Sequence, residues 1–485
     1  MKESICKSAV QATIKIRENN FDLSNGAKSS WLFYFSICSA NILLISVGSM
    51  MVWPSSVIPK LFLNDTELNP FGRPITAMEN SILLSTCSFI SLFGFIGLVK
   101  LADFFGRKTI IRTIGILYLA CLIIIAFGKN IYVYYVFCSI IGVLAAGAII
   151  IIAIYNGEIC TDHERTWVGC MVGFMVPAGN LFGYIIGSLV EPVKELTLIY
   201  ALPLVLHAIL SFFMVESPIY LACKNKKLEG ISTLDRLRKF RKYGDAELEY
   251  LKIEQFNISR ANLNRGPWAI FRSPNSRKAL FLGFVIYATQ ELSGFLIIVE
   301  YLVPIFNDIA LLPGNAISIL FGFTHMVIIF LATVFVNKSG KRPLLLFSTL
   351  GCSGSMALMA FYFYSKQYEL HFLNKIHWLP VICILLFVIS YGMGLGPLPI
   401  GIVGELFDNE VRVTGYSAVT LPYCILAVGS NFAYPLICNS FGVYMCMLFY
   451  SFSCVIGFII FYFYLPETGG KSFMEIQSLL QKNKN

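Results

Sequence analysis

Two stretches of this sequence repeat each other: YNGEICTDHER at residues 155–165 and IVGELFDNEVR at residues 402–412. Each contains a Gly-Glu-apolar triplet and an Arg seven residues after the Glu, and each follows a long apolar run. Two more pairs fall at similar offsets: Gly106-Arg107-Lys108 with Gly340-Lys341-Arg342, and Glu216-Ser217-Pro218 with Pro466-Glu467-Thr468. Matching charge clusters between apolar spans are typical of a membrane protein made of two similar halves.

The composition supports the same interpretation. Of the 485 residues, 56% are hydrophobic and 13% are charged, and the mean hydropathy is +0.71. Soluble domains carry about 25% charged residues. A bilayer core about 30 Å thick needs roughly 20 apolar residues per helix. Twelve such runs occur, near 31–53, 82–100, 109–128, 131–153, 167–189, 197–214, 279–303, 315–336, 343–364, 379–403, 413–437 and 441–464.

We therefore predict an all-α membrane protein with 12 transmembrane helices in two pseudo-symmetric six-helix bundles. The predicted segments are an N-terminal segment (1–30), a first bundle (31–215), a linker (216–278), a second bundle (279–465) and a C-terminal tail (466–485). Charge alternates with apolar residues at helical spacing between 228 and 255, which predicts short amphipathic helices in the linker.

The distribution of Lys and Arg predicts the orientation. The stretch 222–278 holds fourteen of them against six acids, and the short loops at 100–112 and 337–342 are also basic. Because basic loops stay in the cytoplasm, we expect the linker and both termini to be cytoplasmic and the protein to reside in the plasma membrane. The sequon at Asn64 then falls in the longest external loop and predicts glycosylation there.

The sequence also limits the partners. The net charge of +9 is accounted for by the cytoplasmic loops, so the lipid bilayer is a partner and nucleic acid is not. Fourteen Cys are scattered through apolar spans without a CxxC pair, which favours free buried thiols over disulfides or metal ligands. We expect a monomer without cofactor or metal, and the sequence contains no constellation typical of an enzyme.

The cytoplasmic charge clusters predict a gate. Gly permits a sharp turn between two helices, and acidic and basic groups at neighbouring helix ends can pair where screening is weaker than in bulk water. Glu158 with Arg165, and Glu405 with Arg412, can close the same kind of lattice across the bundles. We expect such pairs to form when the cytoplasmic side is shut and to break when it opens. For Lys108 and Arg342, simple anchoring at the membrane surface is the alternative. The predicted gating residues are Asp103, Gly106, Arg107, Glu158, Arg165, Glu216, Gly340, Lys341, Glu405, Arg412 and Glu467.

Together these motifs resemble those of the sugar porter family of the major facilitator superfamily, over nearly the whole chain. The loop 101–108 and the stretch 155–165 resemble two of its signatures. ESPIYL at 216–221 resembles PESPR(Y/F)L, QELSG at 290–294 resembles QQxSG, GPLP at 396–399 resembles GPxP, and PETGGK at 466–471 resembles PETKGK. WPS at 53–55, with Gly392 in the tenth span, is similar to the trehalose-transporter-like branch of insects.

The resemblance implies the major facilitator fold, with a central cavity that opens alternately to either side and binds a hexose or disaccharide. Gln290 and Tyr301 match sugar-contacting residues of the family. Other contact positions differ: the family's Gln, second Gln, first Tyr, Asn and Trp fall on Gly173, Glu291, Glu300, His325 and Ile400. The predicted substrate-binding residues are Gln290, Glu291, Tyr301, His325, Gly173 and Ile400.

Glu291 is the most informative of these. At 100° per residue along one helix, Gln290, Gly294, Ile297 and Tyr301 share a face of the seventh span, and we expect Glu291 near mid-membrane. Three interpretations stay open: the carboxylate accepts hydrogen bonds from a polyhydroxy ligand, it couples transport to protons, or it is a neutral acid bonded inside the bundle. His325 is its expected partner, and such a pair would make binding sensitive to pH.

We predict a facilitative transporter of a sugar, such as a hexose or trehalose, or of a polyol. Five helix-breaking residues predict a hinge in the tenth span: Gly392, Gly394, Gly396, Pro397 and Pro399. Span 1 contains no acid, and Cys138 stands where proton-coupled relatives have an Arg, which favours a uniporter. A proton-coupled sugar symporter and a non-transporting sugar sensor on the same fold are the alternatives.

Overall fold

The computed structural model describes residues 28–65, 67–161, 164–240, 245–261, 271, 274–307, 312–369, 376–407, 412–469 and 475. The first half contains α2 (Trp31–Leu61), α3 (Ala77–Phe105), α4 (Arg107–Phe127), α5 (Ile131–Ile159), α6 (Arg165–Leu189), α7 (Val193–Tyr200) and α8 (Leu202–Ser211). The second half contains α12 (Pro274–Glu291), α13 (Phe295–Phe306), α14 (Gly314–Ser339), α15 (Lys341–Gln367), α16 (Leu379–Met393), α17 (Leu398–Leu406), α18 (Arg412–Phe441) and α19 (Val443–Tyr464).

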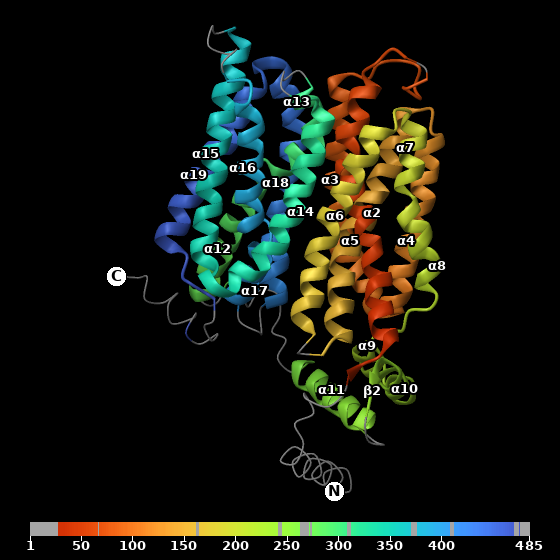
Figure 1. Ribbon diagram of the computed structural model, residues 1–485. Coiled ribbons are helices and arrows are strands. Elements are labelled where there is room, and N and C mark those ends of the chain that lie inside the picture. The colour runs from red at the N-terminus through yellow and green to blue at the C-terminus, as the bar shows by residue number, and fades with distance from the viewer. Residues whose placement is uncertain are drawn as a thin grey trace, which may run out of the picture.

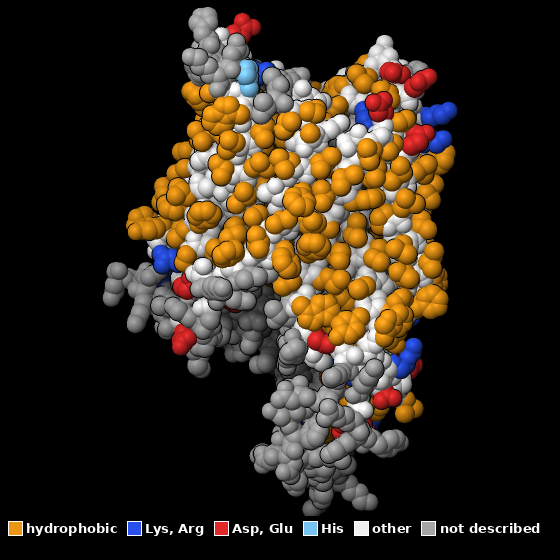
Figure 2. Space-filling view, in the orientation of Figure 1, with side chains coloured by type: hydrophobic (Ala, Val, Ile, Leu, Met, Phe, Trp, Pro, Cys, Tyr) orange, Lys and Arg blue, Asp and Glu red, His pale blue; other side chains and the backbone are white. Residues whose placement is uncertain are grey.

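Twelve helical spans among the described residues are long and apolar enough to cross a membrane. The pairs α7 with α8, α12 with α13, and α16 with α17 each form one span, so each half contributes six. The two halves stand side by side (Figure 1). Hydrophobic side chains cover the visible sides of both halves, and charged side chains gather at the two ends (Figure 2). The predicted fold class is confirmed, and the protein is a multi-pass membrane protein.

Three helices connect the halves below the first one: α9 (Pro218–Cys223), α10 (Lys227–Leu237) and α11 (Asp245–Ala261). They share a small core of Ala222, Leu234, Ala246 and Tyr250. A two-residue strand, β1 (Lys28–Ser29), pairs with β2 (Arg238–Lys239) and ties the start of α2 to this linker. We call this end of the molecule the linker face (Figure 1), and the opposite end, where α2 leads to α3, the distal face.

The first span is longer than predicted. It continues to Leu61 through Pro54 and Pro59 rather than ending near residue 53. Membrane helices tolerate Pro where neighbouring groups satisfy the backbone that the Pro leaves unpaired. Here the flanking side chains bond to other elements: Trp53 Nε1 donates to Thr197 Oγ1 at 3.0 Å, and Ser55 Oγ accepts from the backbone N–H of Val303 at 2.9 Å.

Glycine brings helices of the first half into close contact. A Cβ atom on Gly179 of α6 would lie 2.1 Å from the carbonyl oxygen of Ile45 in α2. A Cβ atom on Gly48 of α2 would lie equally close to the carbonyl oxygen of Val176. The backbones of α2 and α6 therefore touch at two positions where no side chain fits. Small residues allow this approach, which drives helix association in membranes through van der Waals contact.

The halves meet along three helix pairs: α2 with α13, α3 with α18, and α6 with α14. The core of the second half also includes Val52, Ile58, Leu84 and Tyr184 from the first half. These four residues lie in the distal parts of their helices. The apolar contact between the halves is therefore continuous with the second core toward the distal face.

Replacing Gly179 by Ala tests the contact between α2 and α6. The added methyl group cannot be accommodated without moving the backbone of α2, so we expect a loss of about 1–3 kcal/mol in the free energy of unfolding. Thermal unfolding of the purified protein in detergent measures the change. The matched control is Gly169→Ala in the same helix, where a Cβ atom would meet nothing within 4 Å. Equal melting temperatures of the two variants would contradict the close packing.

Candidate functional site

A cluster of charged groups lies on the linker face of the first half, around the turn between α3 and α4. Gly106 makes this turn with φ of +103°, a conformation that favours glycine. Arg107 directly follows the turn and bonds to two acids: its Nη2 lies 2.7 Å from Asp103 Oδ1, and its Nε lies 3.1 Å from Glu158 Oε2. Three members of the predicted gate, Asp103, Arg107 and Glu158, therefore meet at one guanidinium group.

Glu216 completes this cluster by capping α4. Its Oε1 accepts hydrogen bonds from the backbone N–H groups of Arg107 at 2.9 Å, Lys108 at 3.1 Å and Ser217 at 3.0 Å. The first N–H groups of a helix have no partner within the helix, and a carboxylate there also interacts favourably with the helix dipole. A Cβ atom on Gly106 would lie 2.4 Å from Glu216 Oε2, so the cap also requires glycine at the turn.

The second half repeats this arrangement between α14 and α15. Gly340 makes the turn with φ of +80°. Glu467 Oε1 accepts from the N–H of Lys341 at 3.0 Å, and Glu467 Oε2 accepts from the N–H of Arg342 at 3.1 Å. The side chain of Lys341 forms an ion pair with Glu405. The repeated sequence motifs thus correspond to repeated contacts in space.

Each described cluster joins helices of one half. Glu158 pairs with Arg107 and Glu405 pairs with Lys341, all within their own bundles. The side chains of Arg165 and Arg412, which the sequence analysis assigned to a lattice across the bundles, lie outside the described residues. The part of the gate that would cross between the halves therefore stays a prediction.

A second group of predicted residues gathers inside the second half, where the seventh and tenth spans break. Gln290 Nε2 donates to the carbonyl oxygen of Gly396 at 3.4 Å. The ring of Phe295 stacks on Tyr391 with centroids 3.8 Å apart and planes 1° from parallel. His325 also lies next to Phe295, with ring centroids 5.0 Å apart. These contacts combine polar groups with an aromatic surface, as small-molecule sites commonly do.

The helices on either side of these breaks explain this geometry. The seventh span ends its first helix at Glu291 and starts again at Phe295, with Gly294 at φ of +82° between them. The expectation of one continuous helix was wrong, because this left-handed residue turns the chain and the ring of Tyr450 packs against it. The tenth span breaks between Met393 and Leu398, as the glycine and proline residues there predicted.

Glu291 and His325 are both buried, but they do not form a pair. Glu291 is 4% exposed, its Oε1 has no hydrogen-bond partner, and the Tyr423 side chain lies beside it. His325 is 5% exposed and its Nδ1 has no partner. The described contacts of the His325 ring are aromatic instead, with Phe295 and Phe321. Two buried polar groups next to the breaks thus retain unused hydrogen-bonding capacity.

The other predicted binding residues lie apart from this group. Tyr301 is buried and its hydroxyl accepts from Asn80 Nδ2 at 3.0 Å, across the boundary between the halves. Gly173 of α6 is exposed, and a side chain there would meet nothing within 4 Å. Ile400 of α17 is 59% exposed. The structure therefore brings together Gln290, Glu291 and His325, but not the rest.

Two tyrosines that the sequence did not predict, Tyr391 and Tyr423, also belong to this group. Tyr391 directly precedes the run of breakers that begins at Gly392, and that position was the available signal. Tyr423 follows Pro422 inside α18, and nothing in the sequence places it next to Glu291. Its position depends on how α18 packs against α12.

Four hydrogen bonds link the two halves in the described part of the chain. They join Asn80 with Tyr301, Tyr184 with Val299, Ser55 with Val303, and Ser88 with Asn431. Three of the four reach α13, the distal part of the seventh span. We call these four contacts the distal seal. They lie on the distal side of the Gly294 break, opposite the charged clusters of the linker face.

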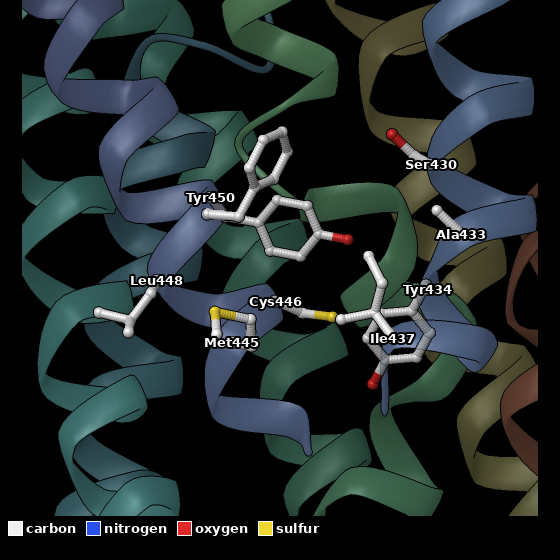
Figure 3. A pocket seen from close by; sticks show the side chains of 9 residues that line it. Ser430, Ala433, Tyr434, Ile437, Met445, Cys446, Leu448 and Tyr450 are labelled. Atoms are coloured by element: carbon white, nitrogen blue, oxygen red, sulfur yellow. The ribbon is translucent and has the colours of Figure 1, made fainter. Parts of the chain in front are cut away.

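A separate pocket of about 380 Å³ opens between α18 and α19 (Figure 3). It is mostly apolar, and its lining includes the exposed side chains of Leu448 and Phe449. It contains none of the predicted substrate-binding residues. Two of its tyrosines pack against the seventh span. The ring of Tyr450 contacts Gly294, and the ring centroid of Tyr434 lies 4.7 Å from that of Tyr301.

The chain is similar in sequence to known transport proteins. The family model described as "Sugar (and other) transporter" matches residues 8–480. The chain is 23% identical over 418 residues to the "Probable metabolite transport protein CsbC" of Bacillus subtilis (strain 168), which covers 84% of this chain and 88% of that protein. It is 23% identical over 439 residues to the "Facilitated trehalose transporter Tret1" of Drosophila pseudoobscura pseudoobscura. That match covers 90% of this chain and 50% of the relative, so the chain spans half of that relative's length.

Among solved structures, the chain resembles the inward open conformation of the xylose transporter XylE from E. coli. The TM-score is 0.77 at 15% sequence identity, and the match covers 93% of this chain and 100% of that chain. The likeness confirms the fold. The resemblance to the sugar porter family and its insect members is also confirmed, and these relatives are membrane transporters rather than enzymes.

Replacing Glu216 by Ala tests the cap on α4. The change leaves the N–H groups of Arg107 and Lys108 without their acceptor, so we expect a loss of about 1–3 kcal/mol in the free energy of unfolding. Thermal unfolding in detergent measures it. The control is Glu67→Ala, because Glu67 is an exposed acid on the distal face. If both variants melt at the wild-type temperature, the cap does not stabilise the first half.

Proposed function

The chain belongs to the sugar (and other) transporter family, and on that premise we propose that it is a facilitative transporter of a sugar or polyol that works by alternating access. Membership of the family makes it a membrane transporter. The substrate, the absence of coupling and the gating scheme are our proposal. We further propose that it acts as a monomer in the plasma membrane, with the linker face and both termini cytoplasmic and Asn64 glycosylated outside.

The distal seal is the observation that best supports the proposal of alternating access. Its four hydrogen bonds all lie on the distal side of the break in the seventh span. The described ion pairs of the linker face lie within one half or within the linker, and none of them joins the two halves. Such a molecule is closed toward the distal face, and the halves can separate toward the linker face without breaking these pairs. We propose that the structure represents an inward-facing state of the cycle.

The residues at the two breaks suit a polyhydroxy ligand. Phe295 and Tyr391 offer a flat aromatic surface, Gln290 offers an amide, and Glu291 offers a carboxylate oxygen without a partner. A charged acceptor forms stronger hydrogen bonds to hydroxyl groups than a neutral amide does. We propose that sugar hydroxyls replace the long Gln290–Gly396 contact and reach Glu291. Gly173 and Ile400, which carry no polar group, would shape the pathway rather than hold the ligand.

Two features favour uniport over proton symport. The first span contains no acid, and Cys138 in α5 cannot act as a cationic partner. We propose that the charged clusters act on access instead. Asp103, Arg107 and Glu158 would hold the linker ends of α3, α4 and α5 as one rigid unit, and Lys341 with Glu405 would do the same in the second half. Arg165 and Arg412 would extend toward the other half when the linker face closes.

Uptake into proteoliposomes tests the function directly. We expect saturable entry of labelled glucose, trehalose or a polyol without an imposed ion gradient, and we expect unlabelled substrate on the inside to drive counterflow. A panel of unlabelled sugars and polyols competing with one tracer identifies the substrate. Entry that requires an inward proton gradient would favour a symporter. Binding of the tracer without any flux would favour a sensor.

Replacing Glu291 by Gln tests the proposed contact with the ligand. The amide keeps the shape of the side chain but loses the charge, so each hydrogen bond from the ligand weakens by about 1 kcal/mol, or roughly fivefold in affinity. Equilibrium binding of the tracer measures the change, with thermal unfolding as a check on folding. The control is Glu254→Gln in α11, which lies outside the spans. Unchanged affinity and selectivity would assign a structural role to Glu291.

A further inference from the structure

Glu300 is a buried acid that the proposed transport mechanism does not use. It lies in α13, one residue before the kink that Tyr301 makes with φ of −122° and ψ of 16°. Its side chain is 9% exposed, and its Oε2 has no hydrogen-bond partner within the protein. Intramembrane acids that face neither water nor a partner are costly and typically functional.

The position of Glu300 ties it to the distal seal. Its neighbours on either side both bond to the other half: the carbonyl oxygen of Val299 accepts from the Tyr184 hydroxyl at 3.0 Å, and the Tyr301 hydroxyl accepts from Asn80 at 3.0 Å. Asn431, which lies beside the Glu300 carboxyl group, donates to Ser88 Oγ of the first half at 2.7 Å. Glu300 therefore lies among the contacts that join the two halves, and side chains of both halves surround it.

No cation offsets the charge of this carboxylate among the described residues around it. The titratable groups that face it come from five elements: Cys87 of α3, Tyr184 of α6, Glu291 of α12, Tyr301 of α13 itself and Tyr450 of α19. All are acids or neutral in their usual form. An ionised carboxylate in such surroundings is strongly disfavoured, whereas a protonated one needs only hydrogen bonds.

We propose that Glu300 is a proton-binding site of the distal seal, so that closing the distal face takes up one proton and reopening it releases that proton to the same side. This inference rests on the proposed alternating access. When the halves separate at the distal face, water reaches the carboxylate and stabilises its ionised form. When they close, a proton from that water binds the carboxylate oxygen, and the neutral carboxyl group is buried.

The direction of the pH effect follows from this scheme. The sealed form holds one more proton than the open form, so acid favours the sealed form and alkali favours the open form. The ratio of open to sealed molecules changes by up to about tenfold per pH unit, the limit for one proton. Because the proton returns to the side from which it came, transport stays uncoupled from a proton gradient while its rate depends on distal pH.

Hydrogen–deuterium exchange tests the proposal without any substrate. The backbone N–H of Val303 donates to Ser55 Oγ across the seal at 2.9 Å, so its protection reports on that contact. We expect this protection, after correction for the intrinsic pH dependence of exchange, to fall by up to about tenfold per pH unit as the pH of wild-type protein in nanodiscs rises. In Glu300→Gln, which mimics the protonated acid, we expect high protection at every pH.

Two further variants complete the design. Glu300→Asp keeps an acid and must keep the pH dependence. Glu79→Gln removes an acid of the distal face that pairs with Arg73 and should behave like the wild type. Protection of Val303 that is independent of pH in the wild type overturns the proposal, even if Glu300→Gln does not fold. So does a Glu300→Gln protein that titrates like the wild type. The uptake assay is independent of this readout, so failure of transport and failure of the proton site are distinguishable.

Discussion

The first N–H groups of a helix have no partner within the helix and need acceptors from other parts of the protein or from water, and the core of a bilayer holds no water. The turns at Gly106 and Gly340 make this requirement acute, because each joins two long spans through a single residue. Glu216 and Glu467 meet it by reaching the turns from the ends of the sixth and twelfth spans. Each carboxylate thereby fixes the relative position of three spans. In the proposed alternating access, these two caps would help to keep each half a rigid unit.

Packing within and between the halves differs in kind. Inside the first half, α2 and α6 touch backbone to backbone at glycine, a contact that cannot open without losing close van der Waals packing. Between the halves, the described polar contacts are single hydrogen bonds on the distal side. Each is worth about 1 kcal/mol. The proposed rearrangement would take place at the boundary between the halves, with the halves moving as bodies.

The two buried acids of the seventh span lie in different surroundings. Glu291 lies at the end of α12 beside the aromatic group of the second half, and Glu300 lies within the distal seal. The Gly294 break separates them, and the ring of Tyr450 packs against Gly294. A movement of α13 relative to α12 would therefore change the surroundings of Glu300. The contacts of Glu291 with the second half would stay as they are.

The sequence alone determined the number of spans, their grouping into two halves and the identity of the clusters on the linker face. It could do so because apolar length, charge distribution and repeated motifs are local properties. The tertiary structure decided which groups actually meet. Sequence spacing could not show that Glu158 and Arg107 pair within one half, that His325 packs among aromatic rings rather than on Glu291, or that Gly294 interrupts the seventh helix. These contacts depend on how separate helices pack and on one left-handed residue, and neither can be calculated from a helical repeat.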